Sequence, residues 1–196
     1  MAAAIPFRMT VCGIDELAGH CEAGASHVLS ILDPDWPLPD AFATYAAHRK
    51  LELRFNDVIE VWPDGTPPRQ ADVAALLAFG RDLASEPAGR APLLVPHLLV
   101  HCHAGVSRST ASMALIAAQA VPAMTAPDVF DAVLRVRPQA WPNLLIVELG
   151  DALLGRGGAL VAAAHGVYRR RLAERPELAE EMTRNGRGRE VAAATG

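Results

Sequence analysis

The sequence has little cysteine, few aromatic residues and little net charge. Of its 196 residues, 3 are cysteine and 5% are aromatic, and the formal net charge is −4. Three cysteines cannot all pair within one molecule, so a disulfide framework is excluded and a reducing compartment is expected. So small a charge gives no general attraction to nucleic acid or to an anionic membrane. Neither is expected as a partner, and any anion site must be built locally.

Long apolar runs are also missing. The longest apolar stretches, near 93–100 and 113–124, are interrupted by proline or polar residues and are shorter than the ~20 residues that a membrane span needs. Residues 1–9 have no basic stretch ahead of their short apolar run, which is the wrong order for a secretory signal. We therefore expect a soluble, cytoplasmic protein.

The length and composition fit one domain. With 51% hydrophobic residues, the chain can bury one sizeable core and is too short for two ordinary domains. We expect a single domain over residues 1–196, with its core at about 9–173. After about residue 182 the chain is rich in arginine and glycine and has little to bury, so 183–196 is expected to be a flexible tail.

The apolar pattern indicates strands early in the chain and helices late. Dense or alternating branched apolar residues predict strands at 26–32, 50–55 and 97–102. Helical spacing of apolar residues predicts helices at 70–85, 109–120, 126–135, 144–154 and 160–172. This order is typical of an α/β domain whose central, mostly parallel sheet is flanked by helices.

The segment HCHAGVSRST at 101–110 carries the chemistry. Cys102 ends a buried strand, a five-residue loop follows it, and Arg108 precedes a hydroxyl residue where a helix begins. Backbone amides in such a loop can form an anion-binding concavity, and the helix N-terminus adds partial positive charge. Gly105 permits unusual backbone angles, and Arg108 offers a planar fork for two phosphoryl oxygens. This field favours the thiolate, so Cys102 is the candidate nucleophile.

The neighbours of Cys102 have expected supporting roles. The residues expected to surround a phosphate are His103, Ala104, Gly105, Val106, Ser107 and Arg108. Ser109 or Thr110 can donate a hydrogen bond to sulfur when it becomes the leaving group, and Ser109 is the first candidate. His101 is expected to fix the loop through hydrogen bonds. No cluster of histidine and carboxylate at ligand spacing accompanies His101 and His103, so no metal or other cofactor is expected.

The pattern His-Cys, five residues, Arg, Ser resembles the signature loop of the protein tyrosine phosphatase superfamily, and Ala-Gly-Val-Ser within it resembles the dual-specificity branch most. RPQAWPN at 137–143 resembles the family segment in which an Arg-Pro and a Pro-Asn pair join two helices behind the loop, with Asn143 as structural support. The resemblance covers about 26–154. It implies the cysteine-phosphatase fold and metal-independent hydrolysis of a phosphorylated protein or other phosphomonoester through a phosphocysteine.

The resemblance also implies a general acid, an aspartate on a loop upstream of the cysteine. Asp57 follows the strand at 50–55 and precedes the helix at 70–85, which matches the family order. It lies 45 residues before Cys102 (102 − 57). Asp64, in the turn-rich segment WPDG and 38 residues before Cys102 (102 − 64), is the alternative.

Other readings of the same residues stay open. A phosphoinositide or RNA 5′-phosphate phosphatase can use the same scaffold, although polyphosphorylated ligands usually require extra cations and the loop between Cys102 and Arg108 contains no lysine. A phosphoresidue-binding module with low turnover is an alternative from another class. Cys12 and Cys21 can hold zinc with nearby histidines, or pair with the active cysteine on oxidation.

Overall fold

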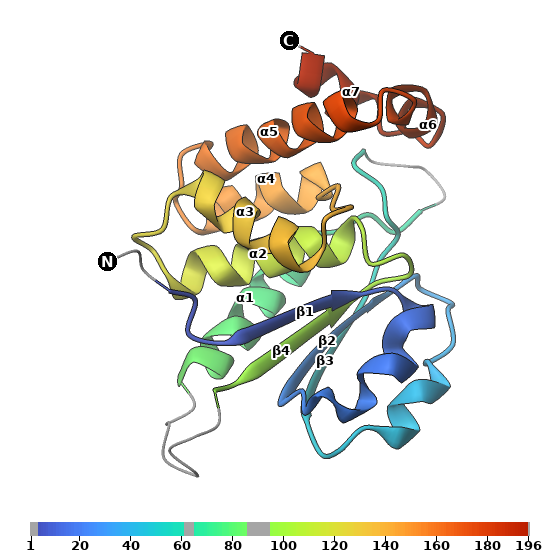
Figure 1. The fold of residues 1–196 in the computed structure, drawn as a ribbon, viewed down its shortest axis with the longest axis vertical. Helices are drawn as coiled ribbons and strands as arrows, with labels where there is room; N and C mark the ends of the chain where they lie inside the picture. The colour runs from blue at the N-terminus through green and yellow to red at the C-terminus, as the bar shows by residue number, and fades with distance from the viewer. Residues whose placement is uncertain (1–3, 61–64, 86–94, 196) are drawn as a thin grey trace.

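The computed structural model describes residues 4–60, 65–85 and 95–195 (Figure 1). The strands are β1 (Arg8–Cys12), β2 (His27–Leu32), β3 (Arg49–Arg54) and β4 (His97–His101). The α-helices are α1 (Gln70–Ser85), α2 (Arg108–Ala120), α3 (Ala126–Val136), α4 (Leu144–Leu153), α5 (Ala159–Glu174), α6 (Leu178–Arg184) and α7 (Gly188–Thr195). Two 3-10 segments, η1 (Ile14–Ala23) and η2 (Asp40–Thr44), lie between the early strands.

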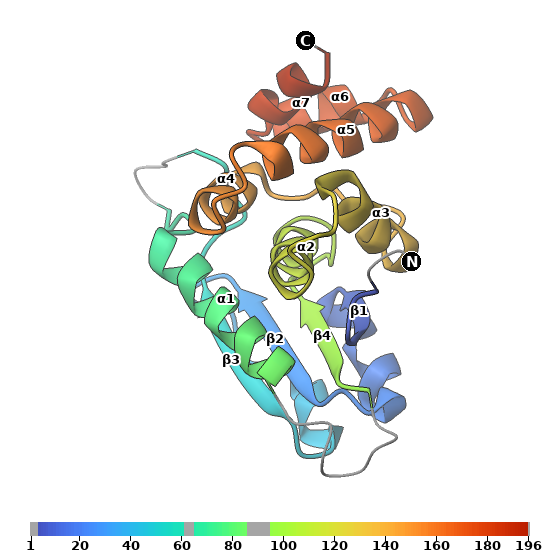
Figure 2. The same cartoon turned by 90° about the vertical axis from the view of Figure 1, so that its left-hand side faces the viewer.

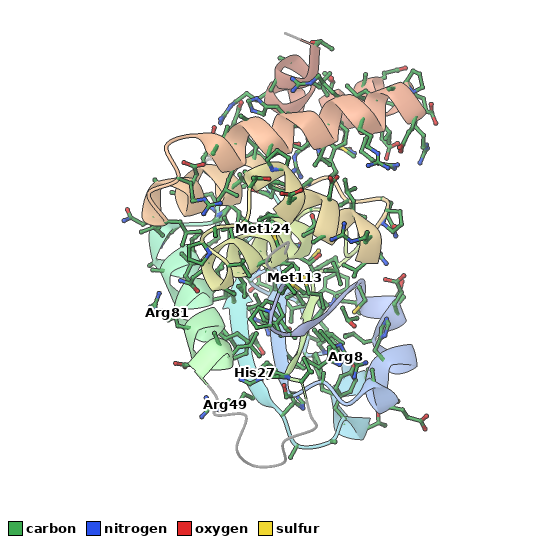
Figure 3. All side chains as sticks on the ribbon, turned by 60° about the vertical axis from the view of Figure 1, so that its left-hand side comes forward. Arg8, His27, Arg49, Arg81, Met113 and Met124 are labelled. Carbon is green, nitrogen blue, oxygen red and sulfur yellow. The ribbon has the colours of Figure 1, made fainter. Side chains whose placement is uncertain are left out.

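The described strands form a parallel sheet in the order β1-β4-β2-β3. Arg8, His27 and Arg49, which begin β1, β2 and β3, lie together at the lower end of the sheet in Figure 3. The carboxyl ends of the strands therefore meet at the opposite edge, where open α/β sheets bind their ligands. The α/β class with a parallel sheet is confirmed, and Cys102 follows directly on β4 at this edge.

The two faces of the sheet have different covers. Helices α1, α2 and α3 pack on one face, with α4 and α5 beyond them and α6 and α7 outermost against α5 (Figure 2). Because strand side chains alternate between faces, Leu29 and Val100 join the main core under these helices. Val28 and Leu99 face the other side, in a smaller core that also includes Leu17 of η1.

The sequence pattern located most elements to within one or two residues. The predicted helix at 70–85 coincides with α1. The strands predicted at 26–32 and 97–102 differ from β2 and β4 by one residue at one end, and the strand predicted at 50–55 is shifted by one residue from β3. The pattern missed β1, because RMTVC at 8–12 is too short to show strand alternation. No helix in the described part of the chain is long and apolar enough to cross a membrane.

The C-terminal segment corrects the expectation of a flexible tail at 183–196. Residues Gly188–Thr195 form α7, which packs against α5. Arg187 and Glu190 are 5% and 0% exposed, and they pair with each other at 2.7 Å. Composition alone assigns such residues to solvent, but two opposite charges that satisfy each other can be buried.

Candidate active site

The loop that joins β4 to α2 turns its carbonyl groups outward, each to a partner outside the loop. Three backbone amides donate to loop carbonyls: Ile14 N to His103 O (2.9 Å), Trp141 N to Val106 O (2.9 Å) and Asn143 N to Ser107 O (3.3 Å). The side chain of Arg137 donates to the other two, from Nη2 to Ala104 O (2.8 Å) and from Nε to Gly105 O (2.9 Å). In a planar trans peptide, the carbonyl and the next amide point in opposite directions. The amides of residues 104–108 therefore turn toward the inner side of the loop, which makes a concavity suited to an anion.

Gly105 lets this loop lie directly on the end of β1. Its φ is +69°, and a Cβ atom there would lie 2.4 Å from the carbonyl carbon of Cys12. Both the backbone angle and the close approach require glycine. Arg137, which holds two of the loop carbonyls, is itself fixed by Glu16 of η1 at 2.9 Å. This hydrogen bond from Arg137 lowers the pKa of Glu16, so the pair stays charged.

Cys102 lies at the base of the loop, and one of the two candidate hydroxyls reaches it. Cys102 is 2% exposed, and its Sγ is 3.2 Å from Ser109 Oγ. The hydroxyl of Thr110 instead donates to the carbonyl oxygens of Val106, at 2.6 Å, and Ser107, at 2.9 Å. The structure therefore brings Ser109 to the sulfur, and Thr110 closes the first turn of α2.

Arg108 is 2% exposed and spans the gap between the loop and two neighbouring strands. Its Nη1 donates to Asp33 Oδ1 at 2.7 Å and to the carbonyl of Phe55 at 2.6 Å. Its Nε is buried and has no hydrogen-bond partner among the described residues. Asp33 is a site residue that the sequence pattern did not single out, although a signal was present: it is the first residue after a buried strand, at the same end of the sheet as Cys102.

The two histidines beside Cys102 are held by different partners. His101 Nε2 lies 2.7 Å from Ser30 Oγ on β2, and burial lowers the pKa of His101 to about 4. His103 Nε2 accepts from the Asp33 amide at 3.2 Å, and its ring packs on Trp36 with centroids 4.4 Å apart. Burial lowers the pKa of His103 as well, so both rings are neutral at pH 7. Over the described ranges, no group of three or more His, Cys, Asp or Glu residues is placed to hold a metal ion.

Asp57 lies after β3, and the structure brings it to the same loop. Its Oδ1 accepts hydrogen bonds from Ser107 Oγ (2.7 Å), Asn143 Nδ2 (2.8 Å) and Arg187 Nη1 (3.0 Å). Its Oδ2 takes no hydrogen bond from the residues that the structure describes. Burial alone would raise the pKa of Asp57, but Arg187, Arg108 and the hydrogen bonds together lower it below its ordinary value. The alternative, Asp64, lies outside the described residues.

No protein-family model matches the chain, and no curated protein matches it. Solved structures do. Human DUSP28 matches with a TM-score of 0.52 at 17% identity, over 79% of this chain and 98% of that one. DUSP15 matches with a TM-score of 0.52 at 21% identity, over 88% and 95%. PTPMT1 in complex with PI(5)P matches with a TM-score of 0.50 at 14% identity, over 79% and 97%.

The chain has the cysteine-phosphatase fold. It is the fold of the solved structures of DUSP28 and DUSP15. The architecture that the sequence resemblance implied is thereby confirmed. At these identities the likeness establishes the fold, and the chemistry of this chain has to be argued from its own residues.

Asn143 does more in this cysteine-phosphatase fold than the structural support expected of it. Its Oδ1 caps α4 by accepting from the amide of Ile146 at 3.0 Å. Its Nδ2 donates to Asp57 Oδ1 and, at 3.2 Å, to the carbonyl of Val58. One side chain thus starts a helix and holds the aspartate segment beside the loop.

Arg187 and Glu190 complete the polar surroundings of Asp57, and sequence analysis missed both. Arg187 Nη2 lies 3.0 Å from Ser107 Oγ, in addition to the contact of Nη1 with Asp57. Glu190 accepts from Trp141 Nε1 at 2.5 Å and from the amide of Leu144 at 2.9 Å. No local motif marks these residues, because their role depends on where α7 packs in the cysteine-phosphatase fold.

Proposed function

We propose that this chain is a cysteine-dependent phosphomonoester hydrolase of the protein tyrosine or dual-specificity type. The observation that carries the proposal is the loop after β4, whose five outward carbonyls leave the amides of 104–108 to face an anion. The buried Nε of Arg108 adds a charged donor on the same loop. A buried donor without a partner costs about 1–3 kcal/mol or more, which a phosphoryl oxygen would offset.

The residues support a two-step reaction. The Cys102 thiolate attacks phosphorus in line, while the loop amides and Arg108 stabilise the equatorial oxygens. The P–O bond to the alcohol or phenol breaks, Asp57 gives that oxygen its proton, and a phosphocysteine forms. Water then attacks phosphorus and gives a proton to Asp57, and the S–P bond breaks. Ser109, 3.2 Å from the sulfur, stabilises the departing thiolate.

The hydrogen bonds of Asp57 assign different tasks to its two oxygens. Oδ1 is occupied by three donors. A proton carried by this carboxyl group therefore belongs on Oδ2. Because the pKa of Asp57 is lowered, the acid form is a minority at neutral pH. Catalysis that depends on this acid is therefore expected to weaken as pH rises from acidic values, because the carboxyl group loses its proton below the ordinary range of an aspartate.

An aryl phosphate is the substrate class that the loop surroundings favour. Trp36 is 46% exposed and packs on His103, the first residue of the anion-binding loop that follows Cys102. Its indole offers an apolar face to an aromatic leaving group. The phosphoinositide alternative draws on the likeness to PTPMT1 in complex with PI(5)P. Against that alternative, residues 103–107 contain no lysine or arginine to neutralise further phosphates.

Hydrolysis of 4-nitrophenyl phosphate with and without a chelator tests this function. We expect turnover that resists the chelator and that Cys102→Ser lowers by roughly 10⁴-fold or more, as loss of an activated nucleophile does. A wild-type chain that binds vanadate but does not hydrolyse the ester would indicate a phosphoresidue-binding module instead. A phosphotyrosine peptide, a 5′-phosphorylated RNA and a phosphoinositide assayed side by side then rank the substrate classes.

A further inference from the structure

The polar network around Asp57 extends to the last helix of the chain. We propose that Arg187, immediately before α7, is a positioning residue that holds the general acid against the phosphate loop, so that α7 belongs to the catalytic unit. The proposal rests on the proposed function, since it assigns a role within that reaction.

The guanidinium of Arg187 joins two segments that must meet for catalysis. Nη1 donates to Asp57 Oδ1 and Nη2 donates to Ser107 Oγ, both at 3.0 Å. Ser107 Oγ donates in turn to Asp57 Oδ1 at 2.7 Å, which closes a triangle. Ser107 is the N-cap residue of α2, yet its hydroxyl does not cap that helix. The hydroxyl donates to Asp57 instead, so the first amides of α2 stay available to an anion.

Glu190 fixes the guanidinium of Arg187 through two hydrogen bonds. Arg187 donates from Nε to Glu190 Oε2 at 2.9 Å and from Nη2 to Oε1 at 2.7 Å, and Glu190 is fully buried. Glu190 also accepts from the indole of Trp141 and the amide of Leu144. Trp141 is the residue whose backbone amide holds the loop carbonyl of Val106. The Arg187 fork is thus fixed to the same segment that shapes the phosphate cradle.

The contacts of Arg187 fix the geometry around Asp57 more than they stabilise the fold. A buried ion pair adds little net stability, because desolvation offsets the attraction. The planar fork of arginine, however, can fix two acceptors at defined positions, which lysine cannot do. Another arginine, Arg189 in the first turn of α7, donates to the carbonyl of Ile59 at 3.2 Å. Two side chains at the start of α7 therefore hold the segment that carries Asp57.

The charges around Asp57 determine what loss of Arg187 would do. Arg187 faces it from just before α7, and Arg108 faces it from the start of α2, where Asp33 offsets the charge of Arg108; the ring of His103, which faces it from the loop, is neutral at pH 7. Removing Arg187 takes away one positive charge and one hydrogen bond to Oδ1. The pKa of Asp57 then rises, and its carboxyl group is held less firmly. The first effect moves the alkaline limb of the pH–rate profile to higher pH, and the second lowers the rate.

Arg187→Met tests the proposal with two aryl phosphates that differ in their need for an acid. Phenyl phosphate has a poor leaving group that requires protonation, and 2,4-dinitrophenyl phosphate has a good one that does not. We expect kcat/KM for phenyl phosphate to fall about 10-fold or more, since misplacement of a catalytic group by about 1 Å can cost 10²-fold. For the dinitrophenyl ester it should stay near the wild-type value. The alkaline limb for phenyl phosphate should move to higher pH.

Two further variants serve as controls. Arg184→Met makes the same change at the end of α6, where the side chain is 71% exposed, and should match the wild type in both assays. In an Asp57→Asn background, Arg187→Met should cause no further loss with phenyl phosphate, because the two residues act through one step. If Arg187→Met does not fold, Arg187→Lys keeps the charge but loses the fork. It should leave the pH limb in place and still lose activity selectively with phenyl phosphate.

The possible outcomes separate this inference from the proposed function. Equal loss with both esters and an unmoved pH limb would mean that Arg187 is only structural, and the inference would be wrong. Wild-type activity in Arg187→Met would also overturn it, with the phosphatase assignment intact. A wild-type chain that hydrolyses neither ester would overturn the proposed function, and the inference with it.

Discussion

The phosphate cradle and the acid side of the site are built in different ways. The cradle consists of consecutive residues, 102–109, between the end of β4 and the first turn of α2. The acid side gathers Asp57, Asn143 and Arg187, where the partners lie 86 and 130 positions from Asp57 in the sequence. The cradle is therefore fixed largely by local backbone geometry. The acid side exists only when three distant segments have packed together.

This difference predicts different consequences of mutation. In the cradle, the same groups bind the phosphate and stabilise the transition state, so binding and turnover should fail together. In the proposed reaction, Asp57 acts on the leaving group, and its hydrogen bonds go to side chains and not to the loop amides that face the phosphate. Turnover should therefore fail there while a phosphate analogue still binds. Substitutions at Arg108 and Asp57 test the two halves of this contrast.

Arg108→Lys should have a larger effect than Asp57→Asn. Lysine keeps a positive charge, but all its donors are on one nitrogen, so it cannot hold Asp33 and Phe55 O and also place a second donor where Nε of Arg108 lies. We expect kcat/KM for 4-nitrophenyl phosphate to fall roughly 10³-fold, and vanadate inhibition to weaken in parallel. Steady-state kinetics with a vanadate titration measures both. Tight vanadate binding in this variant would show that the cradle does not depend on the arginine fork.

Asp57→Asn should separate turnover from binding. The amide keeps the shape of the side chain but cannot supply a proton, so kcat for phenyl phosphate should fall roughly 10²-fold. Vanadate inhibition should remain close to the wild-type value. The alkaline limb of the pH–rate profile should also disappear, because the group that titrates there is gone. If Asp64→Ala produced this pattern and Asp57→Asn did not, the acid would lie in the segment at 61–64.

The contrast also explains how much of the molecule the sequence could predict. Cys102, Arg108, Gly105 and Ser109 form one motif, and their spacing determines their mutual positions once a strand precedes them and a helix follows. Asp57 was accessible only through the order of elements in a resembling family. Arg187 offered no signal, because an arginine in a Gly-Arg-rich segment is usually solvated, and only tertiary packing shows that Glu190 makes its burial tolerable.

The elements of secondary structure show the same difference between local patterns and contacts made by distant segments. Helix α1 was located to the residue, because sixteen residues show the helical period several times over. The edge strand β1 has five residues, Arg8–Cys12, and its role under Gly105 follows from contacts made across the sheet. Asp33 was missed although its position after a buried strand was visible. The segment DPDWP at 33–37 is dominated by turn residues, so its composition indicates a turn and not a site.

A smaller effect is expected from His101, on the pH dependence of the free energy of unfolding. Burial lowers the pKa of His101 to about 4 in the folded chain, from 6.5 in an unperturbed histidine. At pH 7 both the folded and the unfolded chain hold this ring neutral, so it does not affect stability there. As pH falls below about 6.5, His101 becomes protonated in the unfolded chain but stays neutral in the folded chain. The free energy of unfolding should therefore fall by roughly 3 kcal/mol between pH 6.5 and pH 4 on account of this residue.

His101→Gln removes this titration and keeps a polar group near Ser30, so urea unfolding of the variant should depend less steeply on pH over that interval. His165→Gln is the matched control. The pKa of His165 is lowered by burial as well, but this side chain is only half-buried and far from the loop in sequence, so its removal should change the slope less. If both variants kept the wild-type slope, the acid sensitivity over this interval would arise from groups other than these two histidines.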